Sequence, residues 1–378
     1  MNPAVAALRA SVIRELNARK KPTSIDLGLG EPTLSPNLAH FERATRWVAE
    51  HGCRYTPANA GDSELRSAIA AHYGYPALSA ARNVCITTGS QEALYVVLKT
   101  LFDPAEDELL LVDPAFSAYE KIAQVEGLTV RRVAMPEQTG FAFDADRILQ
   151  ALTPRTRAIL LCSPCNPTGR AISRADARTI ARALGELPGA PVYVIHDEIY
   201  REIAYADDIG SFGEYYPYTI AINSLSKSNA LTGLRVGWFA APDEAMGELG
   251  KTHALMTSCA STFGQRVACE IFAGNELGAH REWYAGQRAA ALAAARDAGL
   301  EVVLPDGAFY LCVNVNAGND VEFAWELLEK HDVVAVPAGI FGPGLSGWLR
   351  TSFVGKAEDL RLGYERIAAL AGGGVGTI

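Results

Sequence analysis

Residues 224–238 read SLSKSNALTGLRVGW, and the rest of the chain can be arranged around this stretch. The apolar run YTIAIN precedes it and is typical of a β-strand, so Lys227 is expected just past a strand end, where α/β sheets bind ligands. A lysine amine can form a Schiff base with a carbonyl group. The hydroxyls of Ser224 and Ser226 and the guanidinium of Arg235 suit a phosphate dianion. The pattern predicts a pyridoxal phosphate site, and the alternative is a surface lysine in a polar turn.

The composition limits the class of protein. The chain has 378 residues, 49% of them hydrophobic, which suffices for two domains or for one large domain with a smaller cap. The 34 Lys and Arg against 43 Asp and Glu leave a net charge of −9 without a basic block, so nucleic acid is not expected as a partner. No apolar run is long enough to span a membrane, and the N-terminal segment lacks the apolar core of a signal peptide. We therefore expect a cytoplasmic protein without a membrane partner.

The cysteines do not predict a disulfide framework or a metal site. Cys162 and Cys165 form a CxxC pair, but Pro164 and Pro167 surround the pair with turn chemistry. No second CxxC completes a zinc site. We therefore expect no metal.

Apolar strands alternate with helices from about residue 83 to 257, which predicts a mostly parallel sheet with helices on both faces. The strand NVCITT leads into a helix that begins at Gly89, Ser90 and Gln91. A helix N-terminus offers free N–H groups and the positive end of a dipole to an anion. This helix start is therefore a second candidate for binding a phosphate.

Three further candidates follow strands of the same predicted sheet. Phe116 comes after DELLLVD, Asn166 after RAILLC, and Asp197 ends the apolar run VYVIHD. A carboxylate at a buried strand end is costly unless it is paired, and a protonated pyridine nitrogen would pair with Asp197. Because the candidates all follow strand ends, one sheet edge should bring them together.

Some local expectations concern the backbone. Residues 3–18 predict one amphipathic helix. Ser63 is expected as the N-cap of the helix in SELRSAIAAHYG. Gly233 is expected to ease the turn between Lys227 and the arginine that follows it.

The lysine segment resembles that of the class I and II aminotransferases, which are pyridoxal phosphate enzymes of fold type I. The resemblance continues in GEP at Gly30, in YTPANAGDSELR at Tyr55, in NPTG at Asn166 and in WLRTSF at Arg350. These matches lie in the family's order and extend from residue 28 to 352.

The resemblance implies a large cofactor-binding domain at 36–265 and a small α+β domain made of 1–35 and 266–378. It also implies a homodimer with shared active sites, because Tyr55 would reach the cofactor phosphate of the partner subunit. Each implied role belongs to one of three groups. The catalytic residues would be Lys227, Asp197 and Tyr200; the cofactor-binding residues Gly89, Ser90, Gln91, Phe116, Asn166, Asp197, Tyr200, Ser224, Ser226, Lys227, Arg235 and Tyr55; and the substrate-binding residues Gly30, Asn166 and Arg350.

The implied reaction is transamination between an amino acid and a 2-oxo acid. It would proceed through an internal aldimine on Lys227 and through pyridoxamine phosphate. A carbon–sulfur β-lyase or an aminocyclopropane-carboxylate synthase-like enzyme of the same fold is the alternative. A non-catalytic regulator of this fold is a third possibility, which intact Lys227, Asp197 and Arg350 disfavour. The sequence offers no second arginine that can be assigned to an acidic side chain, so the amino donor stays open.

Overall fold

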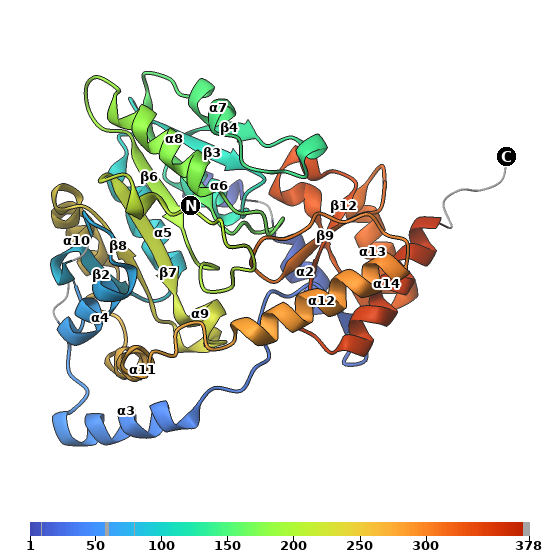
Figure 1. Ribbon diagram of the computed structural model, residues 1–378, viewed down its shortest axis with the longest axis horizontal. Helices are drawn as coiled ribbons and strands as arrows, with labels where there is room; N and C mark the ends of the chain where they lie inside the picture. Colours follow the sequence, from blue (N-terminus) through green and yellow to red (C-terminus); the bar gives the residue numbers. More distant parts are fainter. Residues whose placement is uncertain (9, 57–59, 79, 373–378) are drawn as a thin grey trace.

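The computed structural model describes residues 1–8, 10–56, 60–78 and 80–372. Its largest sheet has seven strands in the order β2-β8-β7-β6-β5-β3-β4 (Figure 1). All neighbours pair in parallel except β8, which is antiparallel to both β2 and β7. The first residue of β8 therefore lies at the same sheet edge as the last residues of the other strands. The strands are β2 (Val84–Thr87), β3 (Glu108–Asp113), β4 (Thr129–Ala134), β5 (Thr156–Cys162), β6 (Tyr193–Asp197), β7 (Thr219–Ser224) and β8 (Gly237–Ala240).

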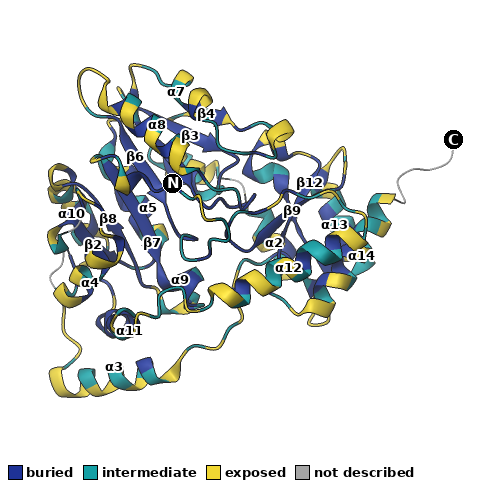
Figure 2. Ribbon diagram, viewed as in Figure 1, coloured by how far each residue is buried: buried dark blue, intermediate teal, exposed yellow. Residues whose placement is uncertain are grey.

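Helices cover both faces of this sheet because its strands are apolar on both sides. Along β3, Leu109 and Leu111 join one apolar cluster, whereas Leu110 and Val112 join another on the opposite face. The first cluster includes side chains of α5 (Ser90–Leu101), α6 (Ala118–Val125) and α10 (Asp243–Thr257), and the second those of α7 (Ala145–Gln150) and α8 (Arg174–Gly185). Figure 2 shows the sheet as buried between these layers.

A third apolar cluster covers the β2–β8 side of the sheet. It gathers around the buried Trp238 and includes residues of α4 (Ser63–Tyr73) and α11 (Thr262–Ala273). Helix α3 (Leu38–His51) packs on α11 and inserts Ala44 into the same cluster. Figure 2 shows that most of the surface of α3 is exposed.

The C-terminal part of the chain builds a second, smaller group of strands and helices (Figure 1). The strands β11, β12 and β9 form an antiparallel sheet, while β1 from the N-terminal segment pairs in parallel with β10. Both chain ends thus contribute to this group. Its elements are β1 (Ile25–Asp26), β9 (Tyr310–Asn314), β10 (Val333–Val334), β11 (Val336–Pro337), β12 (Trp348–Ser352), α12 (Arg281–Asp297), α13 (Asp320–His331) and α14 (Ala357–Gly372).

Two local expectations from the sequence are wrong. Residues 3–18 do not form one helix but contribute to two, α1 (Pro3–Ala6) and α2 (Val12–Arg19), because Ser11 adopts an extended N-cap conformation before the second. Asp62 rather than Ser63 caps α4, since its carboxylate accepts from the backbone N–H of Glu64 at 2.9 Å. Within the described part of the chain, no helix combines the length and apolar character that crossing a membrane requires.

Candidate active site

A cavity of about 280 Å³ lies at the edge of the central sheet where β3, β5, β6 and β7 end. Segments far apart in the sequence reach it, from the N-terminal residues to β12. It brings together most of the residues predicted from the sequence: Gly30, Ser90, Gln91, Phe116, Asn166, Asp197, Tyr200, Ser226, Lys227, Arg235 and Arg350.

Three predicted residues do not line this cavity. Ser224 is fully buried and caps the short helix α9 (Leu225–Ser228), where its hydroxyl accepts from the backbone N–H of Ser226 at 3.1 Å. Gly89 packs behind Arg235, so close that an added Cβ would lie 2.2 Å from its guanidinium Nη2. Tyr55 is 87% exposed and stays outside the cavity of its own chain.

Lys227 lies on α9 directly after β7 and points its amine into the cavity. The Nζ atom donates to the backbone oxygen of Gly30 at 2.7 Å. The backbone oxygen of Lys227 accepts from the Tyr284 hydroxyl at 2.7 Å, which holds the short helix from behind. Burial lowers the pKa of Lys227 to about 8, helped by the positive charges of Arg350 and Arg235 and opposed by Glu31. A larger fraction of this amine is therefore neutral, and nucleophilic, near neutral pH.

Asp197 is the last residue of β6 and lines the same cavity. Its carboxylate accepts from the Tyr119 hydroxyl at 2.7 Å and from the backbone N–H of Ile199 at 3.1 Å. Burial raises the pKa of Asp197 to about 6, although both hydrogen bonds lower it. Tyr119 lies on α6 with its ring against that of Phe116, and it was not among the site residues predicted from the sequence. A cation placed against Asp197 would favour its ionised form.

The N-terminus of α5 and Arg235 border the cavity next to Ser226. Arg235 has a left-handed backbone, with φ 56°, and its guanidinium donates to the backbone oxygens of Thr232 at 2.9 Å and Thr88 at 3.3 Å. Gly233, which was expected to ease this turn, does not adopt a positive φ, so that expectation is wrong. A helix N-terminus, a hydroxyl and a guanidinium together form a suitable site for a phosphate dianion.

Arg350 is a buried cation whose hydrogen-bond partners are neutral. Its Nη1 donates to the Asn166 side-chain oxygen at 3.2 Å, and its Nη2 donates to the backbone oxygen of Gly28 at 2.6 Å. Within the described residues its Nε has no hydrogen-bond partner, and it forms no ion pair. The guanidinium also lies 4.4 Å from the ring centroid of Tyr310. A buried guanidinium held in this way is suited to an incoming carboxylate.

Tyr310, like Tyr119, is a functional candidate that the sequence analysis did not assign. Its hydroxyl lies 3.0 Å from that of Tyr200, and its ring lies under Arg350, so it connects two predicted site residues. Its position in the PDGAFY strand of the resembled family was a signal that could have identified it. Ile13, on α2, also reaches the cavity from a helix that carried no site prediction.

Cys162 and Cys165 of the CxxC pair are buried free cysteines with separate backbone partners. The Cys162 thiol lies against the backbone oxygen of Pro164, and that of Cys165 against the backbone oxygen of Pro114. Burial raises the pKa of both thiols, to about 11 for Cys165. Both are therefore poor nucleophiles, and Cys162 contributes only a neutral wall to the cavity.

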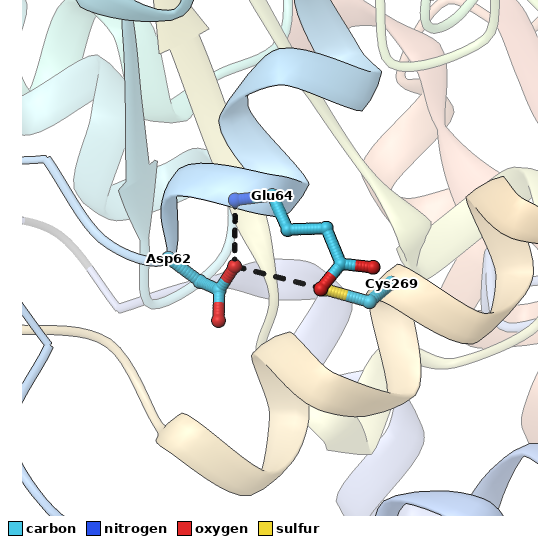
Figure 3. Close-up of side chains that lie close together, drawn as sticks. All are labelled: Asp62, Glu64 and Cys269. Carbon is cyan, nitrogen blue, oxygen red and sulfur yellow. Dashed lines mark hydrogen bonds between the residues drawn. The ribbon is translucent and has the colours of Figure 1, made fainter.

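Asp62, Glu64 and Cys269 lie close enough together to suggest a cation site (Figure 3). Other partners already use these groups. Arg266 lies 3.4 Å from the Asp62 carboxylate and 2.8 Å from that of Glu64, while Asp62 also caps α4. Burial raises the pKa of the Cys269 thiol to about 12. The cluster is an ion-paired contact between α4 and α11.

Comparisons with known proteins agree with this geometry. The sequence model of the family "Aminotransferase class I and II" matches residues 22–367. The aspartate aminotransferase of Pyrococcus horikoshii is 32% identical over 96% of this chain and 95% of its own. A probable N-acetyl-LL-diaminopimelate aminotransferase of Bacillus subtilis is 32% identical over 97% of this chain and 94% of its own. The structure of Thermus thermophilus aspartate aminotransferase with maleate superposes with a TM-score of 0.89 at 29% identity, covering 98% of this chain and 99% of that one.

The fold and the cavity together define an α/β protein in which a lysine amine and two arginine guanidinium groups line one cavity at the sheet edge. The chain belongs to the class I and II aminotransferases, which confirms the family and fold predicted from the sequence. It is an aminotransferase, and the relatives favour this activity over the lyase and synthase alternatives.

Proposed function

We propose that the enzyme uses pyridoxal phosphate, held covalently by Lys227, to transfer an amino group between an amino acid and a 2-oxo acid. The observation that carries the proposal is that Lys227, Asp197, Arg235 and Arg350 line one cavity. Each of these charged groups has a counterpart on the cofactor or the substrate.

The donor set fits the proposed cofactor at both ends. The start of α5, Ser226 and Arg235 would bind the phosphate. Asp197 would hold a proton on the ring nitrogen, because a cation relieves the cost of burying its carboxylate. Asn166 and Tyr200 line the same cavity and would donate to the phenolic oxygen, while Phe116 would stack on the ring. Neither Tyr55 nor Ser224 is needed for these contacts within one chain.

When bound, the cofactor supplies an aldehyde that takes up the amino group and a protonated ring that withdraws electrons from the substrate Cα. Lys227 would move the Cα proton, a task for which an amine with a pKa of about 8 is well suited. Arg350 would bind the α-carboxylate that amino acids and 2-oxo acids share. Gly30, whose backbone oxygen accepts from Lys227, would release this amine for the proton transfer.

The proposed assembly and location rest on other features of the chain. The exposure of Tyr55, together with its place in the family's pattern, supports a homodimer in which this side chain completes the neighbouring site. The net charge of −9 supports an enzyme without a nucleic-acid partner, for which we propose a cytoplasmic location.

Borohydride reduction of the purified yellow enzyme tests where the cofactor is attached. The reduced adduct should appear on Lys227 by peptide mass spectrometry, and Lys227→Ala should yield no adduct while still taking up some cofactor through the phosphate contacts. An adduct on another lysine would contradict the proposal.

A single turnover separates transamination from elimination. With a good amino donor and no 2-oxo acid, the visible cofactor band should disappear and one 2-oxo acid should form per site, without ammonia. Adding 2-oxoglutarate or pyruvate should restore the band. Continuous release of ammonia and pyruvate from cysteine would assign the enzyme to the carbon–sulfur lyases instead.

A further inference from the structure

The turn after β6 has two sides. Asp197 and Tyr200 face the active-site cavity, whereas Glu198 and Arg201 line a second cavity of about 510 Å³. The backbone N–H of Glu198 donates to the oxygen of Ile222 at 2.8 Å and so continues the β6–β7 pairing past the strand end. Because Glu198 lies between Asp197 and Tyr200 in the chain, the way its side chain is held affects the position of both active-site residues.

Glu198 is held by hydroxyl donors although it is almost completely buried. The Tyr75 hydroxyl lies 2.7 Å from each of its carboxylate oxygens, and the Ser211 hydroxyl also donates to it. The Nδ1 atom of His196, two residues earlier in the chain, lies 3.2 Å from a carboxylate oxygen of Glu198. Burial lowers the pKa of this imidazole to about 3, so the ring is neutral. Burial also raises the pKa of Glu198. A buried carboxyl group with several committed donors has little freedom to move.

Arg201 completes this outer network of Tyr75, Glu198, Arg201 and Ser211. Its guanidinium contacts the Tyr75 hydroxyl and Glu198, and its Cζ lies 5.1 Å from the ring centroids of both Tyr75 and Tyr73. Through these contacts the segment that follows α4 is connected to the end of β6.

A branch of the same contacts reaches the end of β7. The Tyr73 hydroxyl accepts from the side-chain amide of Asn223 at 2.7 Å. The side-chain oxygen of Asn223 accepts from the backbone N–H of Ser224 at 2.7 Å. Ser224 caps the helix that carries Lys227. The strand ends bearing Asp197 and Lys227 are thus supported from the same side.

We propose that Glu198, fixed by Tyr75 and Ser211, is a positioning residue that sets the placement of Asp197 and Tyr200 in the active site. None of the four residues of the outer network lines the active-site cavity, so they act through the backbone of the turn and not on the substrate. The inference rests on the proposed cofactor, because Asp197 and Tyr200 act on its ring.

The test compares Tyr75→Phe, Glu198→Gln and Glu198→Ala with a control in the same fold. Tyr216→Phe removes another buried hydroxyl, which donates to the backbone oxygen of Val192 at 2.8 Å near the opposite end of β6. For each variant the measurements are the Tm, the visible circular dichroism of bound pyridoxal phosphate, and the single-turnover rate at saturating amino donor together with its half-saturation concentration.

We expect the single-turnover rate of Tyr75→Phe and Glu198→Ala to fall about tenfold or more, because small misplacements of site groups have effects of that order. Half-saturation by the donor should stay within about twofold of the wild type, since Arg350 is unchanged. The circular dichroism of the cofactor band should change in these variants, and Glu198→Gln, which keeps the shape and one acceptor, should lie between wild type and Glu198→Ala. Tyr216→Phe should lower the Tm without changing the rate or the band.

Two outcomes overturn the inference, and they differ from a failure of the proposed function. If the wild type turns over and the network variants match Tyr216→Phe in rate and circular dichroism, Glu198 only stabilises the fold. If the rate and the donor half-saturation change in parallel with the Tm in all variants, the effect is again structural. A wild-type enzyme that binds no pyridoxal phosphate would refute the proposed cofactor and this inference with it.

Discussion

At the scale of single residues, one short loop contacts both the buried Arg350 and the partly buried Lys227. The backbone oxygen of Gly28 accepts from Arg350, and that of Gly30 accepts from Lys227. Carbonyl groups accept hydrogen bonds from a cation without neutralising its charge. Arg350 therefore keeps its charge for a carboxylate, and Lys227 keeps an amine that can transfer a proton. Gly30 has no room for a side chain, since an added Cβ would lie 2.1 Å from the Tyr310 hydroxyl oxygen.

Replacement of Arg350 by alanine should weaken the binding of amino acids and of 2-oxo acids to the same extent. Removing one partner of a buried charged pair costs roughly 2–5 kcal/mol, so kcat/KM should fall by about 30-fold or more for both half-reactions. Arg361→Ala is the matched control, because Arg361 forms only exposed ion pairs on α14. The cofactor spectrum without substrate should not change in either variant. An unchanged kcat/KM for Arg350→Ala would show that another group binds the carboxylate.

The pKa of Lys227 predicts how cofactor uptake depends on pH. The neutral amine attacks the aldehyde, and its fraction grows as the pH rises through the pKa. With a pKa of about 8, about one amine in ten is neutral at pH 7, against about one in 3,000 for an ordinary lysine. The rate at which the cofactor-free enzyme develops the visible band should therefore increase with pH up to about pH 8 and level off at higher pH. As a control, lysine in solution with its α-amino group blocked should react at a rate that still increases with pH near pH 10. The same profile in the enzyme would contradict the lowered pKa.

At the scale of elements, the proposed phosphate site depends on the turn from β2 into α5. Gly89 has a φ of 79°, and an added Cβ would collide with the Arg235 guanidinium. Gly233 follows Thr232, which lines the cavity, but an added Cβ at Gly233 meets nothing within 4 Å and its φ is not positive. Glycine is therefore required at position 89, whereas the backbone and the surroundings of Gly233 would accept a side chain.

Gly89→Ala should weaken pyridoxal phosphate binding, and Gly233→Ala should not. A left-handed non-glycine residue costs of order 1–3 kcal/mol, and the displaced Arg235 adds to this, so the dissociation constant should rise about tenfold or more. Titration of the cofactor-free enzyme at fixed pH measures the effect. Equal affinities of the two variants would show that the helix start does not hold the phosphate.

Elements were predicted best where the hydrophobic pattern was strong. The buried strands β2, β3, β5, β6, β7 and β8 follow the alternation read from the sequence, because apolar runs bounded by turn residues have few other solutions. The edge strand β4 was not predicted, since most of its residues are exposed or only partly buried. The two N-terminal helices were not separated because the break depends on the extended backbone of Ser11. The cap of α4 was assigned to Ser63 and not to Asp62 because neighbouring polar side chains can equally accept from a helix N-terminus.

At the scale of the whole molecule, we propose the two-domain division expected from the sequence with one change. The expected boundary after residue 265 falls inside α11, which packs with α3 and α4 against the central sheet. A boundary after Ala273 leaves this helix intact. The N-terminal segment belongs with the smaller part because β1 pairs with β10.

The proposed homodimer can be tested through Tyr55, whose 87% exposed side chain lies outside the cavity of its own chain and could reach that of a partner subunit. The enzyme should sediment as a dimer at assay concentration. Mixing inactive Lys227→Ala with an inactive Tyr55→Ala variant should restore part of the activity, since one hybrid site then carries both native residues. An active monomer, or no recovery after subunit exchange is verified, would refute shared sites.

The sequence alone determined the fold class, the family and the sheet edge at which the candidate residues meet, because strand ends and turn residues are local patterns and parallel strands end together. Only the tertiary structure decided that Gly89, Ser224 and Tyr55 lie outside the cavity, that Tyr310 joins Tyr200 to Arg350, and that Glu198 supports Asp197 from behind. The physical reason is that these contacts join residues far apart in the chain. Their geometry is set by how the N-terminal segment, the central sheet and β12 pack together, which no local pattern encodes.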